Sequence, residues 1–325
     1  MANYKNIHGL NIPIRASDPS NPLLGEIWYN STSSSLKGQG YVSSSSWATG
    51  GAMNTARRQV AGFGESPTTA VVVCGQNPPA LANTEEYSGT AWTNVTANPQ
   101  VRVKPFGTGT LTAGLVGGGE SGPSSGTNSG EYDGTSWTNS ATIPLTMYDS
   151  TGIGPIAAGV VVHGPQSPNT AVLLYAAGGT WTTGTSSPSF IGSGSAGGTE
   201  AAGIFTAMVP GDVTTSYEYA SGTWTAGGAL NQARNRAASG AQASQAQTLV
   251  FGGNIADATV KASTELYDGT CWSVQADMNT ARRGLGGAGS TSTSALAFAG
   301  YTGSDQAATE EFTGAGPTTV TISTS

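Results

Sequence analysis

The sequence predicts an all-β protein, and three observations lead to that fold class. Glycine supplies 48 of the 325 residues and charged side chains only 10%, so good helix formers such as Lys, Glu, Gln and Leu are scarce. Short apolar runs are bounded by Gly, Asn, Asp or Ser, which is typical of strands separated by turns. Similar sequence segments also recur along the chain at a regular interval. We therefore expect short strands in repeated units.

The repeat is marked by six tryptophans with successive spacings of 45, 45, 44, 43 and 48 residues. A tyrosine precedes five of them by five or six positions. A period near 45 with a Tyr-to-Trp pair indicates the four-stranded blades of a β-propeller. The tryptophans are Trp47, Trp92, Trp137, Trp181, Trp224 and Trp272, and the tyrosines are Tyr87, Tyr132, Tyr175, Tyr219 and Tyr267. We interpret the tryptophans as packing between blades, although an exposed indole can also stack on a sugar ring.

Each period contains four strand-like runs. Residues 237–277 read AASGAQAS, AQTLVFGGN, ASTELYDG and CWSVQAD. Asp268-Gly269 joins the last two runs, and we expect this dipeptide to supply positive φ at both central positions of a tight hairpin turn. Asp133-Gly134 repeats the arrangement. The same pattern fits residues 58–97 and 103–142 closely and residues 148–187 and 190–230 more loosely.

The two ends of the repeat predict how the blades close into a ring. Trp47 has no earlier strands in its own period, and the last period ends at Phe312 without a tryptophan. A strand around Trp47 that pairs beside the strand ending at Phe312 completes six four-stranded blades and removes the free sheet edges. The text MNTARR follows Trp47 at 53–58 and follows Trp272 at 278–283, which favours this closure.

We therefore predict three regions. Residues 41–316 form a six-bladed propeller, and residues 1–40 form an extended segment with a small hairpin that carries Trp28 and Tyr29. Trp28 lies outside the repeat, so it is either an interface residue or packed in its own hairpin. Residues 317–325 form a C-terminal strand or tail, expected at a blade edge or on a neighbouring subunit.

The pattern resembles the kelch repeat, in which a strand ends in a diglycine, followed by Tyr-Asp and, about six residues later, by Trp. The resemblance covers about residues 41–316. The fourth blade has no diglycine. The pair is intact at Gly117-Gly118 and Gly252-Gly253, and is changed to Cys74-Gly75, His163-Gly164 and Ala299-Gly300 elsewhere.

The amino-acid sequences of several segments are similar to those of low-complexity kelch-like proteins of tailed bacteriophages, notably marine ones. Those proteins are virion structural or tail-fibre components. The segments are ATEEFTGAG, NTARRGLGGAG, ALAFAG and SDPSNPLLGEIWYNSTSSSLKG. This resemblance implies location in a virion, docking to other virion proteins through residues 1–40, and repeated copies set by virion symmetry.

Charge and hydropathy exclude several classes of partner. The net charge is −7 and the basic residues form no stripe, so we expect no nucleic-acid binding. We see no apolar stretch long enough for a signal peptide or a membrane span, and therefore expect assembly in the host cytoplasm without membrane insertion. Cys74 and Cys271 lie in apolar runs and are expected to be buried, unpaired thiols.

The sequence predicts no catalytic, metal or cofactor site. His8 and His163 lack neighbouring ligands, so we interpret them as structural or solvated. Glutamates recur at one place in a strand and arginines recur before blades, and repeated residues are seldom unique catalysts. The arginines either bind loop carbonyls or recognise an anion or acidic glycan; neighbouring arginines point to opposite faces, so only one of each pair can line a site. These residues are Glu85, Glu86, Glu265, Glu310, Glu311, Arg57, Arg58, Arg234, Arg236, Arg282 and Arg283.

The favoured function is a non-enzymatic virion component, such as part of a tail fibre or tail tip, that mediates assembly and contacts a host glycan or protein. The receptor site is unknown; residues 76–83, 119–129 and 254–263 are the longest loops available for contact. One alternative is a glycan-cleaving propeller. It requires two carboxylates in a cleft, for which the candidates are Asp149, Asp212, Asp257 and Asp305. The other is a passive decoration protein without a receptor.

Overall fold

The chain contains two compact units in the computed structural model, which describes residues 12–19, 26–42, 44–120, 126–164, 169–176, 178–206, 213–240, 244–255 and 259–322. One unit is Ser46–Thr313, and the other joins Met1–Ser45 to Gly314–Ser325. The boundaries therefore fall at 45/46 and 313/314, compared with the expected 40/41 and 316/317. The C-terminal segment shares a unit with the N-terminal segment.

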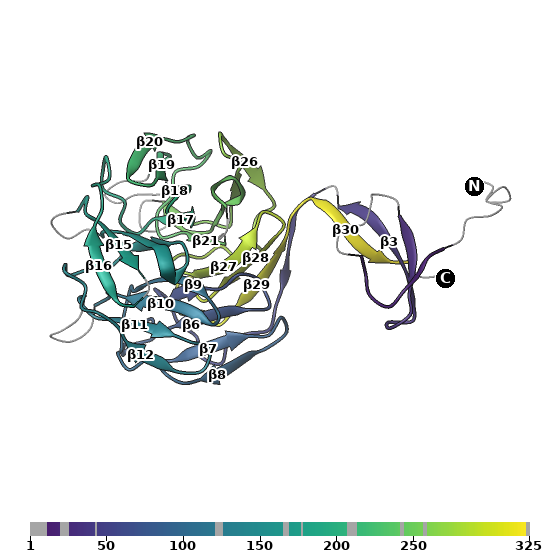
Figure 1. The fold of residues 1–325 in the computed structure, drawn as a ribbon, viewed down its shortest axis with the longest axis horizontal. Helices are drawn as coiled ribbons and strands as arrows, with labels where there is room; N and C mark the ends of the chain where they lie inside the picture. The colour runs from purple at the N-terminus through teal and green to yellow at the C-terminus, as the bar shows by residue number, and fades with distance from the viewer. Residues whose placement is uncertain are drawn as a thin grey trace. The chain divides into compact units, whose positions relative to one another are not determined.

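Residues Ser46–Thr313 form six four-stranded antiparallel sheets arranged about a common centre, with their described parts shown in Figure 1. We name them blades 1 to 6. Blades 1 to 3 contain β5 (Ala61–Phe63), β6 (Ala70–Val73), β7 (Thr84–Tyr87), β8 (Trp92–Val95); β9 (Phe106–Thr110), β10 (Ala113–Gly117), β11 (Ser129–Tyr132), β12 (Trp137–Asn139); and β13 (Thr151–Ile153), β14 (Gly159–Val162), β15 (Val172–Ala176), β16 (Thr180–Thr183).

Blades 4 to 6 complete the propeller, and the loosely patterned fourth blade is a regular sheet. They contain β17 (Ser195–Gly198), β18 (Gly203–Thr206), β19 (Ser216–Ala220), β20 (Thr223–Ala226); β21 (Ala238–Ser239), β22 (Leu249–Phe251), β25 (Thr264–Tyr267), β26 (Trp272–Gln275); and β27 (Gly286–Thr291), β28 (Ser294–Phe298), β29 (Thr309–Thr313), β4 (Ser46–Thr49). Short additions are the 3-10 helices Ile156–Ala158 and Gln245–Gln247 and the pair β23 (Asn254–Ile255) and β24 (Thr259–Val260). In the described residues, none of the helices could cross a bilayer.

The predicted closure is confirmed. Strand β4 pairs antiparallel with β29, with Trp47 opposite Phe312 and Ser46 opposite Thr313. The first strand of each blade contacts the first strands of both neighbouring blades, so β5, β9, β13, β17, β21 and β27 form a closed inner ring. Each blade presents its inner strand to its neighbours, and the apolar runs between the sheets make the core.

The tryptophans connect neighbouring blades, as predicted. Each lies opposite the aromatic residue of the adjacent strand, as Tyr267 lies opposite Trp272. The indole N–H then donates to the preceding blade or its linker: Trp47 Nε1 lies 3.1 Å from Thr264 Oγ1, and Trp92 Nε1 lies 2.8 Å from Thr309 Oγ1. The indole thus contributes apolar area together with a directional contact.

Tyrosine hydroxyls add a second connection between blades. Tyr87 donates to Glu311 and Tyr132 donates to Glu86, each at 2.6 Å. Two further pairs, Tyr175 with Glu131 and Tyr267 with Glu218, repeat the contact. Two blades carry a leucine at the glutamate position. Leu174 of blade 3 stands before Tyr219 of blade 4, which therefore has no carboxylate at this place. Leu266 of blade 5 stands before Phe312 of blade 6. The hydroxyl is therefore lost together with the carboxylate at Phe312 but is kept at Tyr219.

Two turn assignments are corrected by the backbone. Gly134 and Gly269 have positive φ, but Asp133 and Asp268 do not; their carboxylates instead accept hydrogen bonds from the backbone N–H groups two and three residues later. In blade 2 the glycine pair at positive φ is Gly118-Gly119, because Gly117 still pairs within β10. Three consecutive glycines made that register ambiguous in the sequence.

The two cysteines differ in burial. Cys74 is buried as expected, whereas Cys271 is exposed, which corrects the prediction. Trp272 occupies the buried position beside Tyr267, so the preceding residue remains in the hairpin turn, where the Cys271 thiol lies 3.3 Å from Asp268 Oδ2. Both thiols are unpaired.

The second unit is a four-stranded sheet in the order β1 (Ile14–Arg15), β2 (Ile27–Asn30), β3 (Ser35–Val42) and β30 (Gly316–Thr321). Within this chain the C-terminal strand therefore pairs with β3 and not with a blade edge. Trp28 is fully buried, and its indole donates to Asp18 Oδ1 at 2.8 Å. The neighbours Ile27 and Tyr29 are exposed instead.

We predict that Trp47→Ala will lower the free energy of unfolding of the propeller by about 3–5 kcal/mol, as expected for deletion of a buried tryptophan. Trp92→Ala, in a blade made from one continuous segment, should have a similar effect because both indoles connect blades. Urea unfolding followed by circular dichroism measures both. Trp28→Ala is the control outside the propeller. An effect of Trp47→Ala no larger than that of Trp28→Ala on the propeller transition would contradict closure by β4.

We also predict a loss of stability at alkaline pH. Burial, and next the hydrogen bond to a glutamate, raise the pKa of Tyr87, Tyr175 and Tyr267 from 10.0 to about 12. Between these values the folded chain keeps protons that the unfolded chain has lost, so the stabilisation is complete below pH 10 and decreases towards pH 12. As the pH rises across this range, the melting temperature should fall less steeply for Tyr175→Phe than for the wild-type protein. Equal slopes for both proteins would refute this explanation.

Candidate functional site

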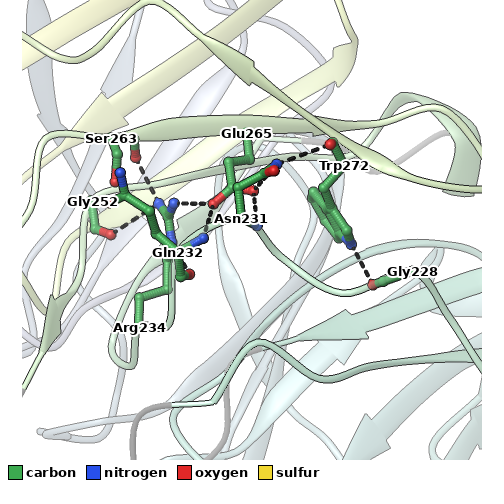
Figure 2. Close-up of polar contacts among 8 residues, drawn as sticks. All are labelled: Gly228, Asn231, Gln232, Arg234, Gly252, Ser263, Glu265 and Trp272. Atoms are coloured by element: carbon green, nitrogen blue, oxygen red, sulfur yellow. Dashed lines mark hydrogen bonds and ion pairs between the residues drawn. The ribbon is translucent and has the colours of Figure 1, made fainter.

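The arginines and glutamates of the repeat form buried clusters between a linker and the following blade. In blade 5 the Arg234 guanidinium lies 2.5 Å from Glu265 Oε1 and donates to the Ser263 carbonyl at 2.6 Å (Figure 2). The backbone N–H and side-chain amide of Asn231 bind the same carboxylate, and the amide also reaches the Trp272 carbonyl. Both charged side chains are fully buried, so each depends on the other.

Blades 1 and 6 repeat this arrangement through Asn-x-Ala-Arg at 54–57 and 279–282. Arg57 pairs with Glu85 at 3.0 Å, and Arg282 pairs with Glu310 at 3.3 Å. Burial lowers the pKa of all three arginines, and the adjacent carboxylates oppose that shift. We call these groups the Arg–Glu clusters. They lie in blades 5, 6 and 1, which are the closing blade and its two neighbours.

The corresponding arginine of blade 2 and the described histidine also have structural contacts. Arg102 donates to the Gly118 carbonyl at 2.6 Å in blade 2, where Gly130 replaces the glutamate. His163 is buried, with Nε2 2.9 Å from the Thr146 carbonyl, which confirms its structural interpretation. His8 lies outside the described residues. No group of three or more potential metal ligands occurs in the part of the chain that the structure describes.

One residue from each blade contributes to a closed ring of backbone hydrogen bonds, at one end of the space that the six inner strands surround. Each lies two positions before an inner strand and has a positive φ of 51° to 60°. Its N–H donates to the carbonyl of the previous member at 2.7–3.1 Å, and Gln59 donates to Gly284 to close the circle. We call this the mouth ring; its members are Gln59, Lys104, Asp149, Ser193, Arg236 and Gly284.

The mouth ring has a repeated backbone but six different side-chain identities. A position that only supported the blades would be expected to keep one residue type, as the tryptophan position does. All six members line a cavity of about 90 Å³, and a cavity of about 120 Å³ follows between inner-strand residues such as Gly62, Gly107 and Gly287. The side chains of the mouth ring therefore break the symmetry that its backbone keeps.

Charged groups at the mouth form specific pairs. Lys104 Nζ lies 3.3 Å from both Asp149 Oδ2 and Glu120 Oε1. Burial raises the pKa of Asp149, and Lys104 opposes the shift. Of the other predicted carboxylates, Asp305 lies 2.6 Å from Arg58, while Asp212 and Asp257 lie outside the described residues.

A larger cavity of about 230 Å³ adjoins the mouth ring and contains three arginines. The adjacent arginines divide their roles as predicted: Arg57 and Arg282 enter the Arg–Glu clusters, whereas Arg58 and Arg283 line this cavity. In each adjacent pair one arginine thus has a structural role and the other lines a cavity. We call it the arginine cavity; it is lined by Arg58, Gln59, Gln76, Arg236, Arg283, Gly284 and Tyr301.

The long loops predicted for contact contribute only in part. Gln76 begins the loop at 76–83 and lines the arginine cavity, and Glu120 belongs to the loop at 119–129. Residues 121–125 and 256–258 of the predicted loops lie outside the described part of the chain. Neither the mouth ring nor Tyr301 was predicted from the sequence. The ring members share only their position, two residues before the first strand of each period, and no side-chain type marks them.

No family model and no curated protein matches the chain. Among solved structures, 272 chains match. One is described as the structure of YjhT; its TM-score is 0.64 at 12% identity, and the match covers 81% of this chain and 95% of that chain. Similarity at this identity concerns the fold alone, and it supports a β-propeller.

We predict that Glu265→Gln will destabilise the propeller by about 3–5 kcal/mol, because it leaves the Arg234 guanidinium buried without its counter-charge. Glu120→Gln is the matched control, since its pair with Lys104 is partly exposed and should contribute at most ~1 kcal/mol. Urea unfolding compares the two variants. Equal small losses would show that the Arg–Glu cluster does not stabilise the blade.

Proposed function

We propose that the protein is a non-enzymatic component of a phage virion, in a tail fibre, tail tip or related appendage. Its roles are assembly with other virion proteins and contact with the host surface. The proposal rests on the similarity of several sequence segments to kelch-like phage proteins and on one structural observation. The chain enters and leaves the propeller at one blade, and both terminal segments belong to a separate unit.

The propeller is joined to the smaller unit at one blade only, which suits a domain that a virion presents at its surface. Ser46 and Thr313 lie opposite each other in the pairing of β4 with β29, so the entering and leaving segments are adjacent. The other five blades are each built from residues internal to the chain. A propeller held in this way keeps its remaining loops available for recognition, which is where binding residues commonly occur.

The smaller unit presents apolar side chains suited to assembly. Ile14 is 75% exposed, Ile27 is 43% exposed and Tyr29 is 37% exposed. Ile14 lies opposite Tyr29 in the pairing of β1 with β2, and Ile27 and Tyr29 are two residues apart, so all three lie on one face of the sheet. Exposed apolar groups gathered on one face are typical of protein contacts. This supports docking of residues 1–40 on other virion proteins.

The carboxylates at the mouth support a binding role over hydrolysis. Glycoside hydrolysis commonly uses two carboxylates that flank the scissile bond. Here Asp149 and Glu120 flank the Lys104 ammonium, and Asp305 is paired with Arg58. A glycan-cleaving propeller and a passive decoration protein remain the competing proposals, and the experiments below separate them.

We predict that Ile14→Asn together with Tyr29→Asn will reduce incorporation into particles by at least about tenfold, because loss of two apolar contacts costs more than ~1.4 kcal/mol. Quantitative mass spectrometry of purified particles, made with each variant as the only copy of the protein, measures incorporation. Val274→Asn is the control, since Val274 is an exposed apolar residue of the propeller at 62%.

Three outcomes would overturn parts of this proposal. Absence of the wild-type chain from purified particles would refute the virion assignment. Shortening of host polysaccharide by the purified protein would refute the non-enzymatic role. If particles lacking the protein attached to host cells at the normal rate, the contact role would fail and passive decoration would be favoured.

A further inference from the structure

The arginine cavity is built from three neighbouring blades. Arg58 and Gln59 precede the inner strand of blade 1, Arg236 precedes that of blade 5, and Arg283 with Gly284 precedes that of blade 6. Gln76 and Tyr301 come from the segments after the second strands of blades 1 and 6. The cavity therefore lies beside the closing blade, at the edge of the mouth ring.

The backbone holds these walls in place. Arg58 and Gln76 exchange two backbone hydrogen bonds, of 2.9 and 2.8 Å. Arg283 and Tyr301 exchange another two, of 3.1 and 2.9 Å, and the three remaining lining residues belong to the mouth ring. A backbone held in this way needs no further ordering when a ligand binds, which favours affinity.

The lining is cationic although the chain is acidic. Three of the 12 basic residues of a chain with net charge −7 line this one cavity, and its lining includes no carboxylate. Bringing guanidinium groups together is unfavourable by Coulomb's law. The Tyr301 ring, with its centre 4.6 Å from the Arg58 guanidinium carbon and 5.5 Å from that of Arg283, offsets part of this cost. Asp305, 2.6 Å from Arg58, offsets another part, and a bound anion would lower the repulsion further.

The other lining groups restrict the class of anion. Gln59 and Gln76 carry carboxamides and Tyr301 carries a hydroxyl, which are groups that both donate and accept hydrogen bonds. Gln76 Oε1 accepts from Arg58 at 3.3 Å, so the Gln76 amide offers its NH2 group. Sugar hydroxyls need such partners, whereas a bare phosphate needs donors only. Guanidinium groups bind carboxylates through two parallel hydrogen bonds. At about 230 Å³ the cavity is smaller than typical drug-sized pockets of ~300–1,000 Å³, so it suits one residue of a glycan.

We propose that the arginine cavity binds a hexuronate residue of an acidic glycan, with its carboxylate on the arginines and its hydroxyls on the glutamines. The inference deepens the proposed host contact and rests on it for its biological meaning. Gly284 leaves the entrance open: a Cβ there would meet only Gln59, at 3.5 Å from Cγ and 3.6 Å from N. A side chain at this position would therefore occupy part of the cavity.

Calorimetric titration of the purified full chain tests the proposal with glucuronate and galacturonate as probes. We expect at least one to bind with a Kd on the order of 1 mM and at least about tenfold more tightly than glucose or galactose. Inorganic phosphate is the comparison anion. If neither uronate bound, if the neutral sugar bound equally well, or if phosphate bound at least as tightly as the uronate, the assignment would be overturned.

Variants locate the site. Arg283→Gln should weaken uronate binding by at least about tenfold through loss of a charge-assisted hydrogen bond. Arg15→Gln removes the same charge outside the propeller and should leave binding unchanged. Gly284→Asp suits the left-handed backbone and adds a repelling carboxylate, so it should abolish binding while melting stays normal. Normal uronate binding by folded Gly284→Asp would place the site elsewhere. These results are independent of incorporation into particles, so this inference can fail while the virion assignment stands.

Discussion

The structure depends on the pairing of two strands from opposite ends of the propeller sequence. Without β4, blade 6 would end at β29 with an unpaired edge, and Trp47 would no longer contact blade 5. Three Arg–Glu clusters lie in the closing blade and in the blades on each side of it. A buried ion pair costs desolvation and is favourable only when its geometry is satisfied. The clusters therefore lie in the blade that strand pairing closes and in the blades on each side of it.

Closure also determines the geometry of the mouth. Every member of the mouth ring donates to one neighbour and accepts from the other, so opening any blade contact would break the circle. The backbone is nearly uniform there, while the side chains change from blade to blade. Positions that repeat, such as Trp272 and Glu265, hold blades together, and positions that vary, such as Lys104 and Arg236, face the cavities. This separation of roles lets a repetitive fold carry a site without symmetry.

The blades were predictable because Trp and Tyr recur with a period that packing imposes. The closure was also predictable, because the missing strands at the two ends are complementary. The mouth ring was not, since its left-handed backbone is held by hydrogen bonds to other blades and Gln59, Lys104 and Ser193 share no side-chain property. The partner of the C-terminal strand was missed for a related reason: alternation in TTVTISTS indicates a strand but does not specify that β3 lies beside it.

Hydrogen exchange of β4 tests the account most directly. Strand β4 is the outer strand of blade 6 and is connected to the rest of that blade only through pairing, whereas β8 is the outer strand of blade 1, which is built from continuous sequence. Closure by β4 predicts that the amides of β4 that bond to β29 exchange as slowly as the amides of β8 that bond to β7. Exchange of these β4 amides as fast as the turn at residues 88–91, with β8 still protected, would contradict the closed ring and the preorganised mouth that depends on it.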